Sequence, residues 1–252
     1  MTLPWIIGSA VLGVLAGPPI RSCVVFYVSA SQGTESGQPP RRACPDCTQP
    51  VLSARRQWGS PLPVTGRCPA CGASIGPYPL VTELVTGLAM ALVAARAGSA
   101  WELAALACLV LLGVPLALID GAVHRLPNPL TAAAFAGVLA FLAVAALTAD
   151  RPGELGRTAI RAAVLSCFYL LLWIIRPSGM GLGDVKLSAS IGLVLGWISW
   201  QALFAGTFLA FILAAACGVV LLATRKAGRG SQLPLGPFML LGALAAVAFL
   251  SL

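Results

Sequence analysis

Eight apolar stretches divide this chain, and they constrain its fold more than any other feature. They lie at residues 3–28, 79–97, 102–119, 129–148, 159–176, 186–199, 201–223 and 235–252. Most approach the ~20 residues that an α-helix needs to cross a bilayer. Charged residues make up only 10% of the chain, against about a quarter in soluble domains, so a soluble globule and a disordered chain are both excluded. The sequence predicts an all-α, polytopic membrane bundle of about eight transmembrane helices.

One long polar segment, residues 29–78, interrupts this pattern. It is rich in Gly, Pro, Ser and Arg, a composition typical of a loop domain rather than a helix. We therefore expect three parts: a first transmembrane helix at 1–28, a small loop domain at 29–78 and a transmembrane domain at 79–252.

Small residues and prolines predict local features of two helices. Ser188, Gly192 and Gly196 recur at four-residue intervals in the sixth stretch, a spacing that lets another helix approach closely. Pro18 and Pro19 fall inside the first stretch, where we expect them to bend or end the helix.

The basic residues predict the orientation in the membrane. If 29–78 is cytoplasmic, the loops at 120–128, 177–185 and 224–234 are cytoplasmic too, because two crossings separate each from the next. These regions and their flanks hold 12 of the 16 Lys and Arg residues, in agreement with the positive-inside rule. The net charge of +8 is therefore interpreted as membrane-orienting and not as a sign of nucleic-acid binding, and both termini are expected outside.

Four cysteines in the polar segment form the strongest local motif. Two Cys-x-x-Cys pairs, Cys44–Cys47 and Cys68–Cys71, are separated by 20 residues, which is typical of a structural zinc site with four thiolate ligands. Two disulfides are the alternative, which a reducing cytosol disfavours. The other cysteines lie in apolar stretches and are expected to be small core residues: Cys23, Cys108, Cys167 and Cys217.

Two aspartates form a second constellation, because the topology brings both to one membrane face. Asp120 closes the third apolar stretch, and Asp184 precedes the sixth. Two adjacent carboxylates share a proton, so one acts as base and the other as acid, as in aspartic proteolysis. Gly181 and Gly183 would let the backbone approach the partner aspartate or a substrate strand. The simpler alternatives are a solvated loop carboxylate for Asp120 and a helix N-cap for Asp184.

Together these motifs resemble those of the type IV prepilin peptidases, membrane aspartic peptidases with a Gly-x-Gly-Asp motif. The matching segments follow the family order: the cysteine tetrad, Tyr78–Val81, Leu118–Asp120, Leu126–Thr131, Gly179–Leu187, Gly192–Trp197 and Leu233–Phe238. The resemblance implies that Asp120 and Asp184 cleave a short basic leader from prepilins or pseudopilins at the cytoplasmic face of the inner membrane. The implied setting is a type IV pilus or type II secretion system, with the lipid bilayer as the other partner and no assigned oligomeric state.

The resemblance also implies a second activity. Members with the zinc loop often methylate the newly exposed N-terminus with S-adenosylmethionine, and Glu83 is the candidate for the methyl-donor site. Thr82 displaces Glu83 by one residue from the family spacing, and the family's Ser-Phe-x-Asn in the first helix is replaced here around Arg21–Phe26. A helix cap or an ion pair with an arginine is the alternative for Glu83.

Two further residues and three rival functions have alternatives that the sequence leaves open. Lys186 could tune the aspartate pair or meet an acidic substrate side chain, or simply extend to the interface. His124, the single histidine, is expected to be an exposed loop residue without a catalytic role. A proton-coupled transporter with Asp120 and Asp184 as its relay would leave the zinc loop unexplained. A membrane scaffold would leave the aspartates unexplained, and a presenilin-like protease lacks the zinc loop.

Overall fold

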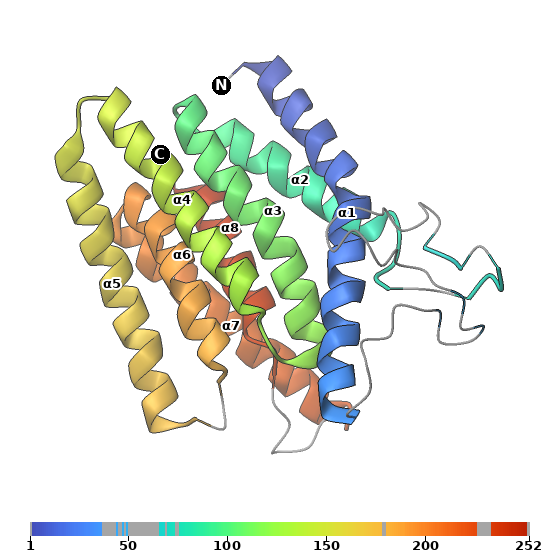
Figure 1. Ribbon diagram of the computed structural model, residues 1–252. Coiled ribbons are helices and arrows are strands. Elements are labelled where there is room, and N and C mark those ends of the chain that lie inside the picture. Colours follow the sequence, from blue (N-terminus) through green and yellow to red (C-terminus); the bar gives the residue numbers. More distant parts are fainter. Residues whose placement is uncertain are drawn as a thin grey trace. The chain divides into compact units, whose positions relative to one another are not determined.

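The computed structural model describes residues 2–36, 44, 47, 49, 66–68, 70–73, 76–177, 180–225 and 233–250. In these ranges the chain forms eight α-helices (Figure 1). They are α1 (Leu3–Ser36), α2 (Val81–Arg96), α3 (Ala100–Val123), α4 (Asn128–Thr148), α5 (Pro152–Ile175), α6 (Leu182–Ile198), α7 (Trp200–Ala223) and α8 (Gly236–Phe249). The predicted all-α class is confirmed.

The helices belong to two compact units. The N-terminal unit, Leu3–Ala91, contains α1, most of α2 and the described part of the four-cysteine segment. The C-terminal unit, Leu92–Leu252 with residues 1–2, contains α3 to α8. Most of α2 thus groups with the four-cysteine segment, and the division into three parts stays a prediction.

Among the described helices, five are long and apolar enough to cross a membrane: α1, through Leu3–Ser29, α3, α4, α5 and α7. The remaining helices, α2, α6 and α8, have 16, 17 and 14 residues. At ~1.5 Å per residue they extend about 21–26 Å, which is less than the ~30 Å hydrocarbon thickness. The expected number of eight helices is thus confirmed for the described residues. Only five of these described helices are long and apolar enough to span the membrane by themselves.

Helix α1 begins at Leu3 as predicted but differs from expectation at its C-terminal end and at its internal prolines. It continues to Ser36, so 29–36, expected as loop, is helical, because each residue added to an existing helix gains a hydrogen bond. Pro18 and Pro19 lie inside α1, and neither ends it. The Ser22 hydroxyl donates to the Pro18 carbonyl at 3.1 Å.

Glycines set the close packing of α5 against α6, which lie side by side in Figure 1. A Cβ atom added at Gly192 would lie 2.8 Å from the Ala162 Cα, and one at Gly196 would lie 2.9 Å from the Arg161 Cβ. The Arg161 guanidinium also donates to the Gly196 carbonyl. The close approach predicted from the small residues of α6 is confirmed at both glycines.

The ends of three helices meet in the C-terminal unit. Asp120 lies in the last turn of α3, α6 begins at Leu182, and α8 begins at Gly236. Helices α3 and α6 each pack against α4 and α8. Residues that are distant in sequence thus come together at one end of this unit.

Candidate active site

Both aspartates line one cavity of about 160 Å³ in the C-terminal unit. Asp120 is 4% exposed and Asp184 is 5% exposed. The cavity walls come from the end of α3, the segment before α6 and the segment before α8. The lining residues are Asp120, His124, Pro177, Met180, Gly181, Asp184, Leu233, Pro234 and Leu235. Ionisable side chains buried in a membrane domain are costly and usually functional.

Each aspartate is held by one backbone amide. The Asp120 Oδ2 atom accepts from the Gly236 amide at 3.0 Å, and the Asp184 Oδ2 atom accepts from the Gly181 amide at 3.1 Å. The Asp184 Oδ1 atom is buried and has no hydrogen-bond partner among the described residues. An unsatisfied buried oxygen is unfavourable, so this atom is available to a proton, a water molecule or a substrate.

The two simpler interpretations of these aspartates are wrong. The N-cap of α6 is Gly181, and Asp184 occupies the third helical position, from which its carboxylate reaches back to the N-cap amide. An acidic side chain often makes this contact in a capping box, and the helix dipole favours it. Asp120 is buried in α3 and is therefore not a solvated loop carboxylate.

Three glycines near the aspartates differ in how much space there is for a Cβ atom. A Cβ atom added at Gly183 would lie 2.6 Å from the Leu126 Cβ, and one at Gly236 would lie 2.9 Å from the Asp120 Oδ2. At Gly181 the nearest atom would be 3.6 Å away, which is ordinary contact. Gly183 thus packs against Leu126, and the close backbone approach to an aspartate is made by Gly236, which sequence reasoning did not assign to the site.

His124 also contributes to the cavity, although we expected no role for it. It is exposed, as predicted, but it lines the cavity wall. Its left-handed backbone, with φ 52°, caps α3, and its amide donates to the Asp120 carbonyl at 2.8 Å. The signal in the sequence was its spacing of four residues after Asp120, which places both on one helical face.

Lys186 lies apart from the cavity wall. Its ammonium donates to the Asn128 side-chain oxygen at 2.7 Å, on the exposed surface where α6 meets the start of α4. Lys186 is not among the residues that line the aspartate cavity. The structure therefore brings Lys186 to Asn128, and a role toward substrate remains a prediction.

Tyr169 of α5 is a buried polar residue that sequence reasoning did not single out. Its ring stacks on Phe211 of α7, with centroids 5.8 Å apart and planes inclined by 17°. A tyrosine inside an apolar stretch was the available signal, since a buried hydroxyl normally needs a polar neighbour.

The four cysteines of the N-terminal unit converge on one point. Their Sγ atoms all lie within 4.8 Å of one another, with Cys44 and Cys71 at 3.5 Å and Cys47 and Cys68 at 3.6 Å. A tetrahedral zinc ion with Zn–S bonds of ~2.3 Å separates its sulfurs by about 3.8 Å, whereas disulfide sulfurs lie ~2.05 Å apart. The four thiols are not joined by S–S bonds, so the geometry is compatible with a zinc site and disfavours the disulfide alternative.

The two Cys-x-x-Cys turns have the same backbone design. The Cys44 amide donates to the Gln49 carbonyl at 2.9 Å, and the Cys68 amide donates to the Ala73 carbonyl at 2.8 Å. In both turns the amide of the first cysteine thus binds the carbonyl of the residue five positions later. Gly72 has φ +73°, a left-handed conformation that favours glycine.

Backbone amides favour the thiolate form of one of the four cysteines. The amides of Cys71 and Ala70 lower the pKa of the Cys68 thiol to about 7, whereas burial and the neighbouring thiols raise the pKa of Cys47 and Cys71. The cysteine cluster packs against Val25 of α1. The four-cysteine segment thus contacts α1 through apolar side chains.

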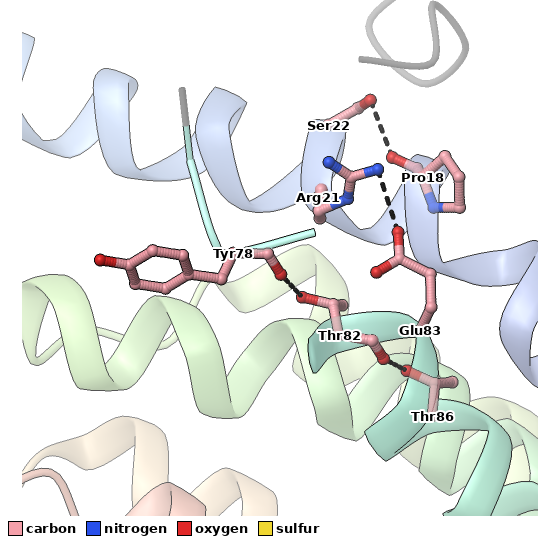
Figure 2. Close-up of polar contacts among 7 residues, drawn as sticks. All are labelled: Pro18, Arg21, Ser22, Tyr78, Thr82, Glu83 and Thr86. Atoms are coloured by element: carbon pink, nitrogen blue, oxygen red, sulfur yellow. Dashed lines mark hydrogen bonds and ion pairs between the residues drawn. The ribbon is translucent and has the colours of Figure 1, made fainter. Parts of the chain in front are cut away.

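Glu83 forms a buried ion pair with Arg21 (Figure 2). The Arg21 Nη2 atom lies 3.0 Å from the Glu83 Oε1 atom, and the two residues are 0% and 8% exposed. Any Cβ at Gly17 of α1 would collide with the Glu83 side chain. Of the alternatives that the sequence left open for Glu83, the structure contains the ion pair, while its Oε2 atom has no hydrogen-bond partner among the described residues.

Comparison with known proteins adds independent findings. Residues 103–222, which include both aspartates, match the Type IV leader peptidase family. The chain is 31% identical over 205 residues to the Prepilin leader peptidase/N-methyltransferase of Aeromonas hydrophila. It is 32% identical over 209 residues to the protein of the same name from Pseudomonas aeruginosa. Each of these alignments covers 79% of this chain and 68% of the relative. It is 32% identical over 224 residues to the Type 4 prepilin-like proteins leader peptide-processing enzyme of Escherichia coli, with 82% and 75% covered. No solved structure matches the chain.

Proposed function

This chain belongs to the type IV leader peptidase family, and we propose that it is a membrane aspartic endopeptidase that removes the leader of type IV prepilins or pseudopilins. The observation that carries the proposal is the pair of buried aspartates, Asp120 and Asp184, in one small cavity. The basic loops that flank this end of the helices support cleavage at the cytoplasmic face of the inner membrane. Family membership favours this activity over a proton-coupled transporter.

In the proposed reaction the two aspartates share one proton, because two buried carboxylates close together do not both ionise. The ionised carboxylate takes a proton from a water molecule while the water oxygen bonds to the scissile carbonyl carbon. The protonated carboxyl gives its proton to the carbonyl oxygen. When the tetrahedral intermediate collapses, the C–N bond breaks and the amine leaves with a proton from the pair, whose roles belong to neither residue alone.

The surrounding backbone serves this chemistry by orienting the carboxylates. The amides of Gly236 and Gly181 each hold one Oδ2 atom, so neither side chain must be ordered when substrate arrives. The unpartnered Asp184 Oδ1 atom is then free to hold the shared proton or the attacking water. Preorganisation of this kind contributes to catalysis because no reorganisation is needed during the reaction.

A zinc ion held by Cys44, Cys47, Cys68 and Cys71 would have a structural role. With all four coordination positions filled by protein thiolates, no position remains for water or substrate. Its binding would instead stabilise the fold of the small polar segment.

We also propose that the chain methylates the new N-terminus with S-adenosylmethionine, as the names of its relatives suggest. Glu83 is the candidate residue near the methyl donor. Its unpartnered Oε2 atom supports an interaction with the sulfonium cation, whereas the pairing of Oε1 with Arg21 supports a structural role. We expect replacement of Glu83 by Gln to reduce methylation more than cleavage.

The decisive experiment incubates the purified protein with a type IV prepilin and S-adenosylmethionine, and follows the product by mass spectrometry. We expect loss of the leader without need for the methyl donor, and addition of one methyl group when the donor is present. Asp184→Asn is the matched control, which should leave the prepilin intact. An intact prepilin with the wild-type enzyme, or cleavage by the control, would overturn the peptidase; a cleaved but unmethylated product would overturn only the methyltransferase.

A further inference from the structure

One face of α1 contacts both α2 and the four-cysteine segment. Gly17, Arg21 and Val25 recur at four-residue intervals, so they share this face and follow one another about 6 Å apart along the helix axis. Gly17 packs against the Glu83 side chain, and Arg21 forms the ion pair with it (Figure 2). Val25 packs against the cysteine cluster. Arg21 therefore lies one helical turn from the residue of α1 that contacts the thiols.

Gly66 brings the four-cysteine segment close to Arg21 itself. It is buried, it lies two residues before Cys68, and its φ is +63°, a backbone conformation that favours glycine. A Cβ atom added at Gly66 would lie 3.2 Å from the Arg21 Nη1 atom and 2.9 Å from the Pro79 Cδ atom. Pro79 lies four residues before Glu83, at the entry to α2. The Gly66 backbone thus packs close to both Arg21 and the segment that leads into α2.

Burial makes the ion pair of Arg21 and Glu83 dependent on these neighbours. The two residues are 0% and 8% exposed, so the surrounding groups keep water away from their 3.0 Å contact. The hydroxyls of Thr82 and Thr86 donate to backbone carbonyls four residues earlier (Figure 2), so their protons are not available to the Glu83 carboxylate. Water screens an exposed ion pair and leaves it weak. Loosening the segment at Gly66 would therefore admit water to the guanidinium and release the carboxylate.

We infer that Arg21 is a positioning residue that couples the four-cysteine segment to Glu83. Metal binding by the four cysteines stabilises their segment, and Gly66 within it then keeps water from Arg21, which in turn fixes the Glu83 carboxylate. Such coupling is reciprocal, so breaking the ion pair also weakens zinc binding. The inference rests on the proposed function in one respect, because Glu83 is the candidate residue near the methyl donor. The coupling thus acts on methylation, whereas cleavage belongs to the aspartates of the other unit.

The first measurement needs neither prepilin nor methyl donor. Zinc affinity is determined by competition with a chelating dye for the wild type, Arg21→Met and Arg21→Lys. We expect Arg21→Met to weaken zinc binding about tenfold, and Arg21→Lys to recover part of this loss because lysine keeps the charge. Arg161→Met is the matched control, since it removes a guanidinium that binds the Gly196 carbonyl in the C-terminal unit. This control should keep the zinc affinity of the wild type.

Hydrogen exchange of residues 84–90 in α2 reports the other direction of the coupling. Removing zinc with the chelator should speed exchange in the wild type, because the ion pair that joins α1 to α2 weakens. In Arg21→Met the chelator should add little, since the pair is already broken. A merely structural zinc site would instead give independent effects of the chelator and of the substitution.

The second measurement is methylation of a pre-cleaved pilin at saturating zinc. Gly66→Ala and Gly72→Ala both place alanine at a positive φ, +63° and +73°, but a Cβ at Gly72 meets nothing within 4 Å. We expect Gly66→Ala to raise the KM for S-adenosylmethionine about fivefold or more, with leader cleavage unchanged. Gly72→Ala should resemble the wild type. Gly66→Ala keeps both charges, so it tests the contact even where Arg21→Met does not fold.

Three outcomes would each overturn the inference while leaving the proposed activities in place. They are a zinc affinity that falls equally in Arg21→Met and Arg161→Met or in neither, exchange in α2 that the chelator does not change, and an equal KM in Gly66→Ala and Gly72→Ala. Failure of the wild type to methylate, with the zinc and exchange results as expected, would instead overturn the proposed methyltransferase and retain the coupling of Arg21 to the four-cysteine segment.

Discussion

The Gly236 amide donates a hydrogen bond to the Asp120 carboxylate at 3.0 Å, across 116 residues of sequence. This bond joins the last turn of α3 to the first turn of α8. Asp184, in contrast, is held by Gly181, three residues away at the start of its own helix. One member of the pair therefore depends on tertiary packing and the other on local helix geometry, and substitutions at the two places should have different effects.

Replacing either aspartate by asparagine should abolish cleavage. Asn cannot hold the shared proton or accept one from water, so we expect Asp120→Asn and Asp184→Asn each to lower kcat at least about a thousandfold, the range of positioned acid–base groups. Cleavage of a purified prepilin is measured with equal amounts of membrane-inserted enzyme. Near wild-type cleavage by either variant would show that the aspartates do not act as a pair.

A methyl group at position 236 should impair the enzyme through Asp120. The new Cβ of Gly236→Ala would lie 2.9 Å from the Asp120 Oδ2, so α8 or the carboxylate must shift, at a cost of about 1–3 kcal/mol for overpacking. We expect kcat to fall about tenfold or more, since ~1.4 kcal/mol in the barrier corresponds to a factor of ten. Gly121→Ala is the matched control, because a Cβ next to Asp120 at this position meets nothing within 4 Å. Equal effects of the two substitutions would contradict the proposed contact.

The two glycines of the Gly-x-Gly-Asp motif should respond unequally to alanine. Gly183→Ala places a Cβ 2.6 Å from the Leu126 Cβ, whereas Gly181→Ala meets no atom closer than 3.6 Å. Gly181 also has φ −81°, which alanine adopts readily. We expect Gly183→Ala to lower both cleavage and thermal stability, with Gly181→Ala close to wild type in both. The reverse order would mean that the motif glycines act on substrate rather than on the packing against Leu126.

Zinc binding should be lost at acid pH. Zinc binds the thiolate form of cysteine, so protons compete with the metal for all four ligands as the pH falls. We expect one zinc per chain by elemental analysis at about pH 8, with release to a zinc-sensitive dye as the pH falls toward about 5. Cys68→Ser should weaken zinc binding without loss of helical circular dichroism, and Cys167→Ser, at an exposed cysteine of α5, is the matched control. Metal-free protein with paired disulfides would contradict the site.

The buried pair of Arg21 and Glu83 should be strongly coupled. Removing one partner leaves the other charge buried, so Arg21→Met and Glu83→Gln should each destabilise the N-terminal unit by about 3–5 kcal/mol. The double variant should lose less than the sum of the two, because no isolated charge remains. Thermal unfolding in detergent measures all three variants. Additive losses would show that the 3.0 Å contact does not couple the two side chains.

Several parts of the site could be predicted because they depend on local spacing or on the count of crossings. The Cys-x-x-Cys pairs predicted a convergent thiol cluster, since four residues in one tight turn direct two thiols to a common point. Asp120 and Asp184 were expected to meet because alternate helix ends lie on one side of a membrane, and both line one cavity. The end of α1 was placed too early, because a polar sequence does not by itself end a helix.

The sequence by itself determined the number of helices, their order and the ends at which the reactive residues gather, because these follow from the length of each apolar stretch. Only the tertiary structure decided that Gly236 binds Asp120, that Tyr169 stacks on Phe211, and that Arg21 pairs with Glu83. Such contacts depend on how each helix is rotated about its axis and how far it slides along its neighbours. Helices such as α4, α7 and α8 are apolar on all sides, so their sequences carry little information about which face turns inward. Close packing of side chains and backbone in three dimensions selects that rotation.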